Sequence, residues 1–448
     1  MYKLFFCFIL FFTGFFAFAQ SEDEEKERYS QIMRYGTDAE IANVIQTIKE
    51  KDIEWVDEEI AAAAVSTKSA AIQSAAINYF SYREDPALEE AALDFLQNRF
   101  GVEAAVISAS IDYLGKIGAA RAQEPLKEII LTDEARYQNQ ALRSLGMALK
   151  NASSEEKEEA LNFFLDFYRN KAPSDAARRV VIEAVGEGAL KDAAPFLEEI
   201  ILDSEAPADL RVEALNSAGK IGGADALQEA VIGALNAEQP LIRTAAVGAL
   251  GAFSGAAVDR ALLDAMRDSF FRTRLAAIKS VSKRAIPDAV GFLEFRAKND
   301  DAASVREEAV RTLGAYQSAA AETALESIYG DKRAPEKIRL MAAEALVKSN
   351  PSKYTAKIAV DLEEARKTRQ KTLYAGLVKA VSASTSSSGL KPVVESLLSS
   401  SDAADRAYAL DIIASARLTG FIGDLQRMVD DPKNGLKNRA KMVLEKLK

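Results

Sequence analysis

The sequence contains no histidine among its 448 residues, and its only cysteine is Cys7. Without histidine, the chain cannot form a Ser-His-Asp triad, a Cys-His pair or a histidine-ligated zinc site. Cys7 lies in an apolar run that we expect to be cleaved off, so the processed chain should contain no disulfide, catalytic thiol or thiolate-bound metal. P-loop, EF-hand and GxGxxG motifs are also missing. We therefore expect a non-enzymatic protein with no cofactor and no metal.

Aromatic residues are scarce at 8%, and 8 of the 21 phenylalanines lie before residue 19. The rest of the chain must pack mainly alanine, leucine, isoleucine and valine, and alanine has the highest helix propensity. No stretch sustains the alternation typical of strands. Positive charge is in the minority as well, with 57 Lys and Arg against 67 Asp and Glu. Because general nucleic-acid binding depends on a basic surface, we expect protein partners and no nucleic acid.

The first residues resemble a targeting segment. Lys3 precedes an apolar run from Leu4 to Phe18, and Ala17-Phe18-Ala19 matches the small-residue cleavage site of a secretory signal peptide. The run is shorter than the roughly 20 apolar residues that span a bilayer, although an uncleaved anchor is the alternative. We expect residues 1–19 to be a signal peptide, cleaved before Gln20. The processed chain would then have no integral membrane span and would lie in the periplasm or outside the cell, most simply in a bacterial envelope.

After the signal segment, residues 20–36 form an acidic lead, which we expect to be frayed or disordered. The remainder, residues 37–448, repeats one pattern. A basic residue is typically followed by apolar residues three, four and seven positions later, and successive basic residues are 31 to 35 apart. The basic positions are Arg178, Arg211, Arg243, Arg274, Arg306, Arg339, Lys371, Arg406 and Lys437. A fixed period of this size is typical of a solenoid.

Spacings of three, four and seven place the apolar residues on one stripe of a helix, and a second amphipathic helix follows in each repeat. We call this pattern, a first position followed by apolar residues three, four and seven positions later, the frame. Upstream of Arg178 the frame continues without the basic residue, for example from Ile107 and from Gln138. The sequence therefore predicts an all-α fold over residues 37–448. We expect a right-handed α-solenoid of about 12 stacked antiparallel helix pairs, a HEAT-like superhelix.

Glycine often stands eight residues after the first position of the frame, as at Gly115, Gly146, Gly186, Gly219, Gly251 and Gly314. Because glycine within a helix costs about 1 kcal/mol relative to alanine, we expect close helix packing to require it. This interpretation predicts that Gly251→Leu would destabilise the array.

The turn and helix Asp301, Val305-Arg306, Ala309 and Leu313-Gly314 resemble the signature of the HEAT-repeat family, especially the short HEAT-like repeats of phycobilisome lyases. In that family, the aspartate of the turn and the arginine form a ladder between adjacent repeats, and the inner helices line a concave surface. The resemblance implies a structural ladder made by Arg178, Arg211, Arg243, Arg274, Arg306, Arg339 and Arg406.

The segment from Arg267 to Arg284 combines several basic residues with Phe270 and Phe271 in an acidic protein. It is a candidate patch for an acidic segment of a partner. Its members would be Arg267, Arg272, Lys279, Lys283 and Arg284. In the alternative interpretation, Arg274 is a ladder residue, one phenylalanine is buried and the other cations are only solvated.

The HEAT resemblance is specific for the fold and unspecific for the function. We expect a non-enzymatic scaffold of the cell envelope that binds partner proteins along the solenoid surface. Two alternatives stay open: a self-assembling structural component of an envelope machine, and a HEAT-like lyase or chaperone enzyme. The sequence determines neither the partner nor the oligomeric state.

Overall fold

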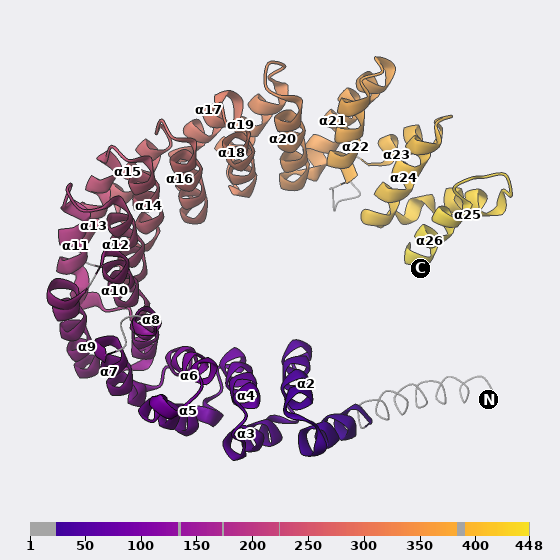
Figure 1. Ribbon diagram of the computed structural model, residues 1–448. Coiled ribbons are helices and arrows are strands. Elements are labelled where there is room, and N and C mark those ends of the chain that lie inside the picture. Colours follow the sequence, from indigo (N-terminus) through magenta and orange to yellow (C-terminus); the bar gives the residue numbers. More distant parts are fainter. Residues whose placement is uncertain (1–23, 133–135, 173, 224, 383–389, 448) are drawn as a thin grey trace. The chain divides into compact units, whose positions relative to one another are not determined.

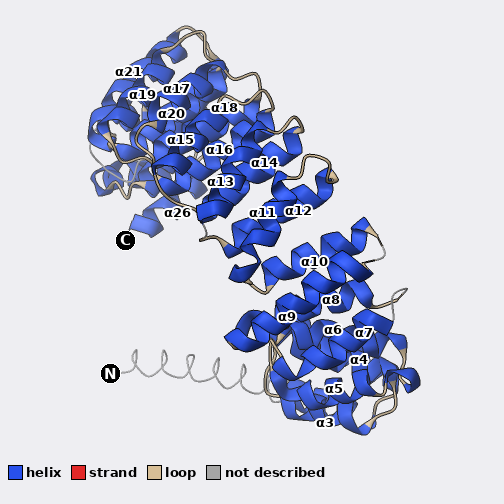
Figure 2. Ribbon diagram, turned by 90° about the vertical axis from the view of Figure 1, so that its left-hand side faces the viewer, coloured by secondary structure: helices blue, strands red, loops and turns tan. Residues whose placement is uncertain are grey.

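The computed structural model describes residues 24–132, 136–172, 174–223, 225–382 and 390–447. The predicted signal peptide, residues 1–19, lies outside this part of the chain. The described residues form helices joined by loops and contain no strand (Figure 2). The chain divides into two compact units, Met1–Ala234 and Leu235–Lys448, which are described separately below.

In each unit, the helices that carry the repeated frame alternate with a second set. We call the two sets the frame row and the second row. In unit 1, the frame row consists of α2 Asp38–Lys51, α4 Ala70–Arg83, α6 Ala104–Lys116, α8 Gln138–Ala148, α10 Asp175–Glu187 and α12 Ala208–Ile221. Its second row consists of α3 Asp57–Ser66, α5 Glu89–Gln97, α7 Gln123–Thr132, α9 Ser154–Asp166, α11 Ala194–Leu202 and α13 Asp225–Gly233.

In unit 2, the frame row consists of α14 Pro240–Ala249, α16 Phe271–Arg284, α18 Ala303–Ala315, α20 Glu336–Ser349, α22 Lys371–Ser382, α24 Ala403–Ser415 and α26 Lys437–Leu447. Its second row consists of α15 Ala256–Ala265, α17 Ala289–Asn299, α19 Ala319–Gly330, α21 Pro351–Lys367, α23 Lys391–Leu398 and α25 Ile422–Asp430. Short 3-10 helices and one π-helical turn extend or connect these helices: η1 Pro86–Leu88, η2 Arg99–Gly101, η3 Ala120–Ala122, η4 Leu149–Asn151, η5 Phe167–Lys171 (the π turn), η6 Lys191–Ala193, η7 Ala234–Asn236, η8 Leu250–Ala252 and η9 Thr419–Phe421.

Within each unit, a frame helix packs on the frame helices before and after it and mainly on the second-row helix that precedes it in the chain (Figure 1). For example, α16 packs on α14, α18 and α15. Such packing between consecutive repeats defines a solenoid. The described helices form twelve frame-and-second pairs, from α2 to α25, followed by α26. The prediction of an all-α solenoid of about 12 helix pairs is therefore confirmed.

The core of each unit lies between the two rows. The apolar residues three, four and seven positions into the frame are buried, as Ala246, Val247 and Leu250 show in α14 and η8. None of these three side chains has measurable solvent exposure. Alanine often stands three residues after the first position of the frame. Because its side chain is small, neighbouring helices can approach closely without a gap between their side chains.

Close approach explains three of the frame glycines. A Cβ on Gly146 would lie 2.5 Å from the carbonyl oxygen of Ala184, and one on Gly115 would lie 2.7 Å from the Cα of Ser144. A Cβ on Gly186 would similarly lie 2.6 Å from Ser217 Oγ. The expectation that close helix packing requires glycine is wrong for Gly251, where a Cβ would meet no atom within 4 Å.

The acidic lead is more ordered than expected. Residues 24–35 are helical, and the Tyr29 side chain is only 2% exposed. Its ring stacks on Trp55 with the centroids 6.1 Å apart, and its hydroxyl donates to Glu25 Oε1 at 2.7 Å. One aromatic side chain among many charged ones therefore anchors this segment on the first repeat of unit 1.

Across the residues that the structure describes, no helix combines the length and apolar character needed to cross a membrane.

Candidate protein-interaction surface

Six of the seven predicted ladder arginines donate to backbone carbonyls in the turn before their own helix or in the last turn of the preceding helix. In Arg243, Nη1 donates to Ala237 O at 2.9 Å and Glu238 O at 2.8 Å. In Arg211, Nε and Nη2 donate to Ile201 O at 3.1 and 3.0 Å. The other four bond in the same way: Arg274 to Asp268 and Ser269, Arg306 to Asp300 and Asp301, Arg339 to Tyr329, and Arg406 to Ser400. A cation at this place also complements the negative end of the preceding helix dipole.

Arg178 differs from the others. Its Nη1 donates to Asp175 Oδ1 at 3.2 Å within its own helix, and its guanidinium lies 5.7 Å from the ring centroid of Tyr168.

Two of the arginines also reach an aspartate of the following repeat. Arg243 forms a bidentate pair with Asp268, at 2.7 Å from Nε and 3.0 Å from Nη2. Arg274 forms a similar pair with Asp300, at 2.7 Å from both nitrogens, and its Nη2 also contacts Asp301. Bidentate pairs of this kind are among the stronger hydrogen-bonded contacts in proteins. Within the described part of the chain, no carboxylate lies within 4 Å of Arg211, Arg306, Arg339 or Arg406.

Asp300 shows how such a pair changes a carboxyl group. Its side chain has no solvent exposure, and burial by itself favours the neutral acid. This burial is outweighed by hydrogen bonds from Arg274 and from the Ala302 amide at 3.0 Å, so the pKa of Asp300 lies below the usual aspartate value.

The structure does not keep the five residues of the predicted patch together as one group. Arg284 binds Asp259 Oδ1 through Nε and Nη2, at 3.0 and 2.6 Å, and donates to Phe253 O at 2.8 Å. Arg267 contacts Asp264 at 3.5 Å, and its guanidinium lies 4.7 Å from the centroid of the Phe292 ring. These two cations are therefore occupied by contacts within the protein.

The other three patch residues, Arg272, Lys279 and Lys283, form a line on α16. They are seven and four residues apart, which places them on one face of the helix. All three are exposed, and among the described residues no carboxylate lies within 4 Å of any of them. We call these three residues the α16 stripe. Next to it, the guanidinium of Arg272 lies 5.8 Å from the ring of Phe271.

The neighbouring frame helices differ on the two sides of the stripe. On α14, the position that corresponds to Lys279 is Gly248, where an added Cβ would meet no atom within 4 Å. On α18, the corresponding residue is Arg311, and its charge is balanced by Glu307 and Glu308. The α16 stripe therefore borders an uncharged, open face on α14 and a neutralised face on α18.

Charge is distributed unevenly between the rows. The frame helices of unit 2 contain 18 basic and 7 acidic residues, whereas its second-row helices contain 9 basic and 11 acidic. In unit 1, the frame helices contain 9 of each, and the second-row helices contain 2 basic and 17 acidic. Positive charge therefore gathers on the frame row of unit 2 although the whole chain has a net charge of -10.

The sequence interpretation missed this segregation because it considered only the total charge. Assigning the charges separately to the two sets of predicted helices would have shown it.

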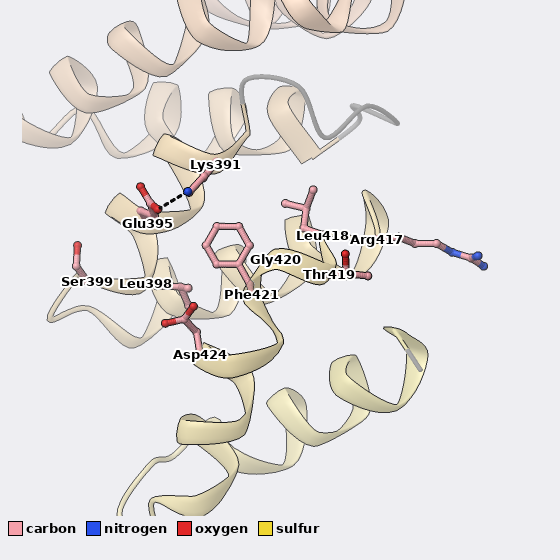
Figure 3. A pocket seen from close by; sticks show the side chains of 10 residues that line it. All are labelled: Lys391, Glu395, Leu398, Ser399, Arg417, Leu418, Thr419, Gly420, Phe421 and Asp424. Carbon is pink, nitrogen blue, oxygen red and sulfur yellow. Dashed lines mark ion pairs between the residues drawn. The ribbon is translucent and has the colours of Figure 1, made fainter.

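Cavities occur in the second row of unit 2, on both sides of α23. One has a volume of about 730 Å³ and is lined by Lys391, Glu395, Phe421 and Asp424, among others (Figure 3). The Phe421 ring lies in the middle of this lining, whereas Arg417 extends away from it. A second cavity of about 550 Å³ lies between α21 and α23. Helix α23 has only 8 residues beside the 17 of α21, so it is too short to fill the row.

In the lining of the first cavity, Lys391 and Glu395 form an ion pair at 3.8 Å. Nowhere in the described residues do three or more carboxylate or thiol side chains gather as a metal site.

Comparisons with known proteins agree with the repeat architecture. A family model described as Spirochaete HEAT repeat protein matches residues 33–443. The comparison with curated proteins gives no match.

Among solved structures, the chain is similar to an engineered protein, with 16% identity, coverage of 87% of this chain and 98% of that one, and a TM-score of 0.32. It is also similar to Kap121p, with 14% identity, coverage of 90% of this chain and 51% of that one, and a TM-score of 0.45. Its similarity to importin beta has 13% identity, coverage of 96% of this chain and 71% of that one, and a TM-score of 0.47. The chain spans about half the length of Kap121p. Likeness at this level concerns the fold alone.

Proposed function

This chain belongs to the family of spirochaete HEAT-repeat proteins, and we propose that it is a non-enzymatic scaffold of the cell envelope that binds partner proteins along its solenoid surface.

The packing of the frame row is the observation that carries this proposal. Each frame helix packs mainly on the neighbouring frame helices and on the second-row helix that precedes it, so one face of the frame helix is left out of the core. In unit 2 this face continues over successive helices from α14 to α26, and it carries exposed polar and charged side chains such as the α16 stripe. Extended surfaces of this type are how solenoid proteins bind other macromolecules.

The proposed location in the envelope rests on the amino-terminal sequence. Lys3, the apolar run and the Ala17-Phe18-Ala19 site together have the organisation of a secretory signal peptide. Export also agrees with a processed chain that needs no free thiol in an oxidising compartment.

Chemical cross-linking in native envelopes, followed by purification of the protein and mass spectrometry, tests the scaffold proposal. We expect the same partner proteins in independent preparations, with cross-links that map to frame-row lysines such as Lys279 and Lys283. A preparation from cells that lack the protein is the control. If no protein is enriched over this control, the scaffold proposal is wrong.

Self-assembly is the second candidate function, and the opposite charges of two rows favour it. The second row of unit 1, with 17 acidic residues against 2 basic, could bind the basic frame row of unit 2 in another copy. Light scattering of the purified protein separates the two candidates. A monodisperse monomer at low salt contradicts self-assembly, whereas growing, salt-sensitive assemblies support it.

A further inference from the structure

We infer that the α16 stripe, together with the uncharged face of α14 beside it, binds an acidic and extended segment of a partner protein. This inference rests on the proposed scaffold function and names the chemistry of its partner.

The three cations of the α16 stripe are available to a partner. Helices α14 and α16 contain six basic residues and no acidic ones. Three of the six are neutralised by aspartates: Arg243 by Asp268, Arg274 by Asp300 and Arg284 by Asp259. The remaining three are the members of the stripe, and within the described residues no carboxylate is close enough to balance them.

The surface beside the α16 stripe offers both open space and apolar contact. The face of α14 carries Gly248, which leaves open space, and Leu241, whose side chain is 59% exposed. Phe271, at the start of α16, is 37% exposed. A segment that lies along the stripe could therefore place an apolar side chain against Leu241 or Phe271 while its carboxylates contact the cations.

The spacing of the three cations suits an extended chain. A helix rises about 1.5 Å per residue, so Arg272 and Lys279 are about 10 Å apart along the axis, and Lys279 and Lys283 are about 6 Å apart. An extended chain rises about 3.3 Å per residue. Because alternate side chains of an extended chain share a face, carboxylates at positions i, i+4 and i+6 would lie on one face, about 13 and 7 Å apart, where the long side chains of the three cations can reach them in order.

The distribution of charge favours this partner over two others. A nucleic acid needs a long basic track, but Arg311 on the next helix is neutralised and the chain as a whole carries a charge of -10. A second copy would offer carboxylates spread over the six second-row helices of its unit 1, instead of the single line that the stripe presents.

The test uses a fluorescein-labelled 12-residue peptide with glutamates at positions i, i+4 and i+6, one leucine and otherwise neutral residues. Fluorescence anisotropy measures its binding to the purified full-length protein. The variant is R272E/K279E/K283E, and the matched control is R260E/K332E/R333E, which makes the same charge change at exposed sites of unit 2 outside the frame row. Because all six residues are exposed, we expect both variants to keep the circular dichroism spectrum and unfolding temperature of the wild type.

We expect the stripe variant to bind the peptide at least about tenfold more weakly, since like charges then face each other, and the control to stay within about twofold. The peptide with glutamine in place of glutamate should lose its binding to the wild type, and added salt should weaken binding of the acidic peptide. Gly248→Lys adds a cation in open space and should tighten binding, whereas Gly248→Ala should not.

Equal peptide binding by the wild type and the stripe variant would overturn the inference. Tighter binding of a single-stranded oligonucleotide that is lost in the stripe variant would identify a nucleic-acid surface instead. Salt-sensitive assemblies of the wild type that dissolve in the stripe variant would identify a second copy as the occupant. In the cross-linking experiment, partners captured equally by the stripe variant contradict the inference but leave the scaffold function standing, whereas no captured partner contradicts the scaffold function itself.

Discussion

At the scale of single residues, the arginines of the frame show that one sequence position can have two structural roles. Six of the seven predicted ladder arginines donate to backbone carbonyls, but Arg243 and Arg274 also bind an aspartate of the next repeat. The Arg274 side chain is only 6% exposed, and that of Asp300 is fully buried. Removing one member of a buried ion pair leaves the other charge without compensation, which is much more costly than losing a surface pair.

We therefore expect Arg274→Ala to lower the free energy of unfolding by up to about 3 kcal/mol, because the buried Asp300 then keeps only Arg296 Nη1, at 3.3 Å, and the Ala302 amide as partners. Urea unfolding followed by circular dichroism measures this change. The control is Arg306→Ala, which loses bonds to carbonyl groups but leaves no carboxylate unpaired, so its effect should be clearly smaller. Equal losses in the two variants would contradict the interpretation.

The same pair predicts a pH dependence. Burial alone would raise the pKa of Asp300, but the bonds from Arg274 and Ala302 lower it below the unfolded value of about 3.9. A group with a lowered folded pKa stabilises the protein above its unfolded pKa, and this contribution is lost as the pH falls through the folded pKa. Stability measured from pH 7 down to pH 2 should therefore decrease below about pH 4, and this decrease should be smaller in Arg274→Ala, where Asp300 keeps only Arg296 and the Ala302 amide as partners.

At the scale of helices, equivalent glycines are not equally important. Gly115, Gly146 and Gly186 lie within α6, α8 and α10, where the next frame helix comes close enough to exclude a Cβ. Gly251 lies in the 3-10 turn η8, after α14 has ended at Ala249. A Cβ added at Gly251 would have no other atom within 4 Å. The change from an α-helix to a 3-10 turn thus removes the constraint, although the sequence frame is the same.

Gly146→Ala should destabilise the protein by about 1–3 kcal/mol, because the new methyl group would overlap the backbone of Ala184. Gly251→Ala should be neutral or stabilising by up to about 1 kcal/mol, since it restricts the unfolded chain without a clash. Thermal unfolding of the two variants under identical conditions compares them. A large loss of stability in Gly251→Ala would show that packing does constrain that turn.

At the scale of the whole molecule, charge is sorted by row and by unit, so the total charge says little about any one surface. The net charge of -10 reflects mainly the second row of unit 1, with its 17 acidic residues, while the frame row of unit 2 is basic. A protein of this kind can stay soluble through one surface and attract acidic partners through another.

The proposed export makes a prediction about the whole chain. Protein isolated from its native cells should begin at Gln20, because Ala17-Phe18-Ala19 is the expected cleavage site. Intact-mass spectrometry and amino-terminal sequencing measure this directly. Recovery of a chain that still begins at Met1 would contradict cleavage and favour an uncleaved anchor.

The sequence by itself determined the helices, their pairing into repeats and the residues that face the core. These features follow from apolar spacings of three, four and seven residues and from a period of 31 to 35, both of which can be read along the chain. It also located the arginines and the segment that contains the α16 stripe. It did so because helical geometry converts such spacings into faces without any knowledge of the neighbours.

Only the tertiary structure decided which of these residues are held by contacts with a neighbouring repeat and which are available to bind a partner. Arg274 and Asp300, Gly146 and Ala184, and Tyr29 and Trp55 are each 26 to 38 residues apart, and their contacts depend on how one repeat is placed against another. For the same reason, Arg284 proved to be occupied by Asp259, while Lys279 has no nearby carboxylate among the described residues. Spacing along the chain determines the face on which a side chain lies, but the packing of neighbouring repeats determines what it contacts.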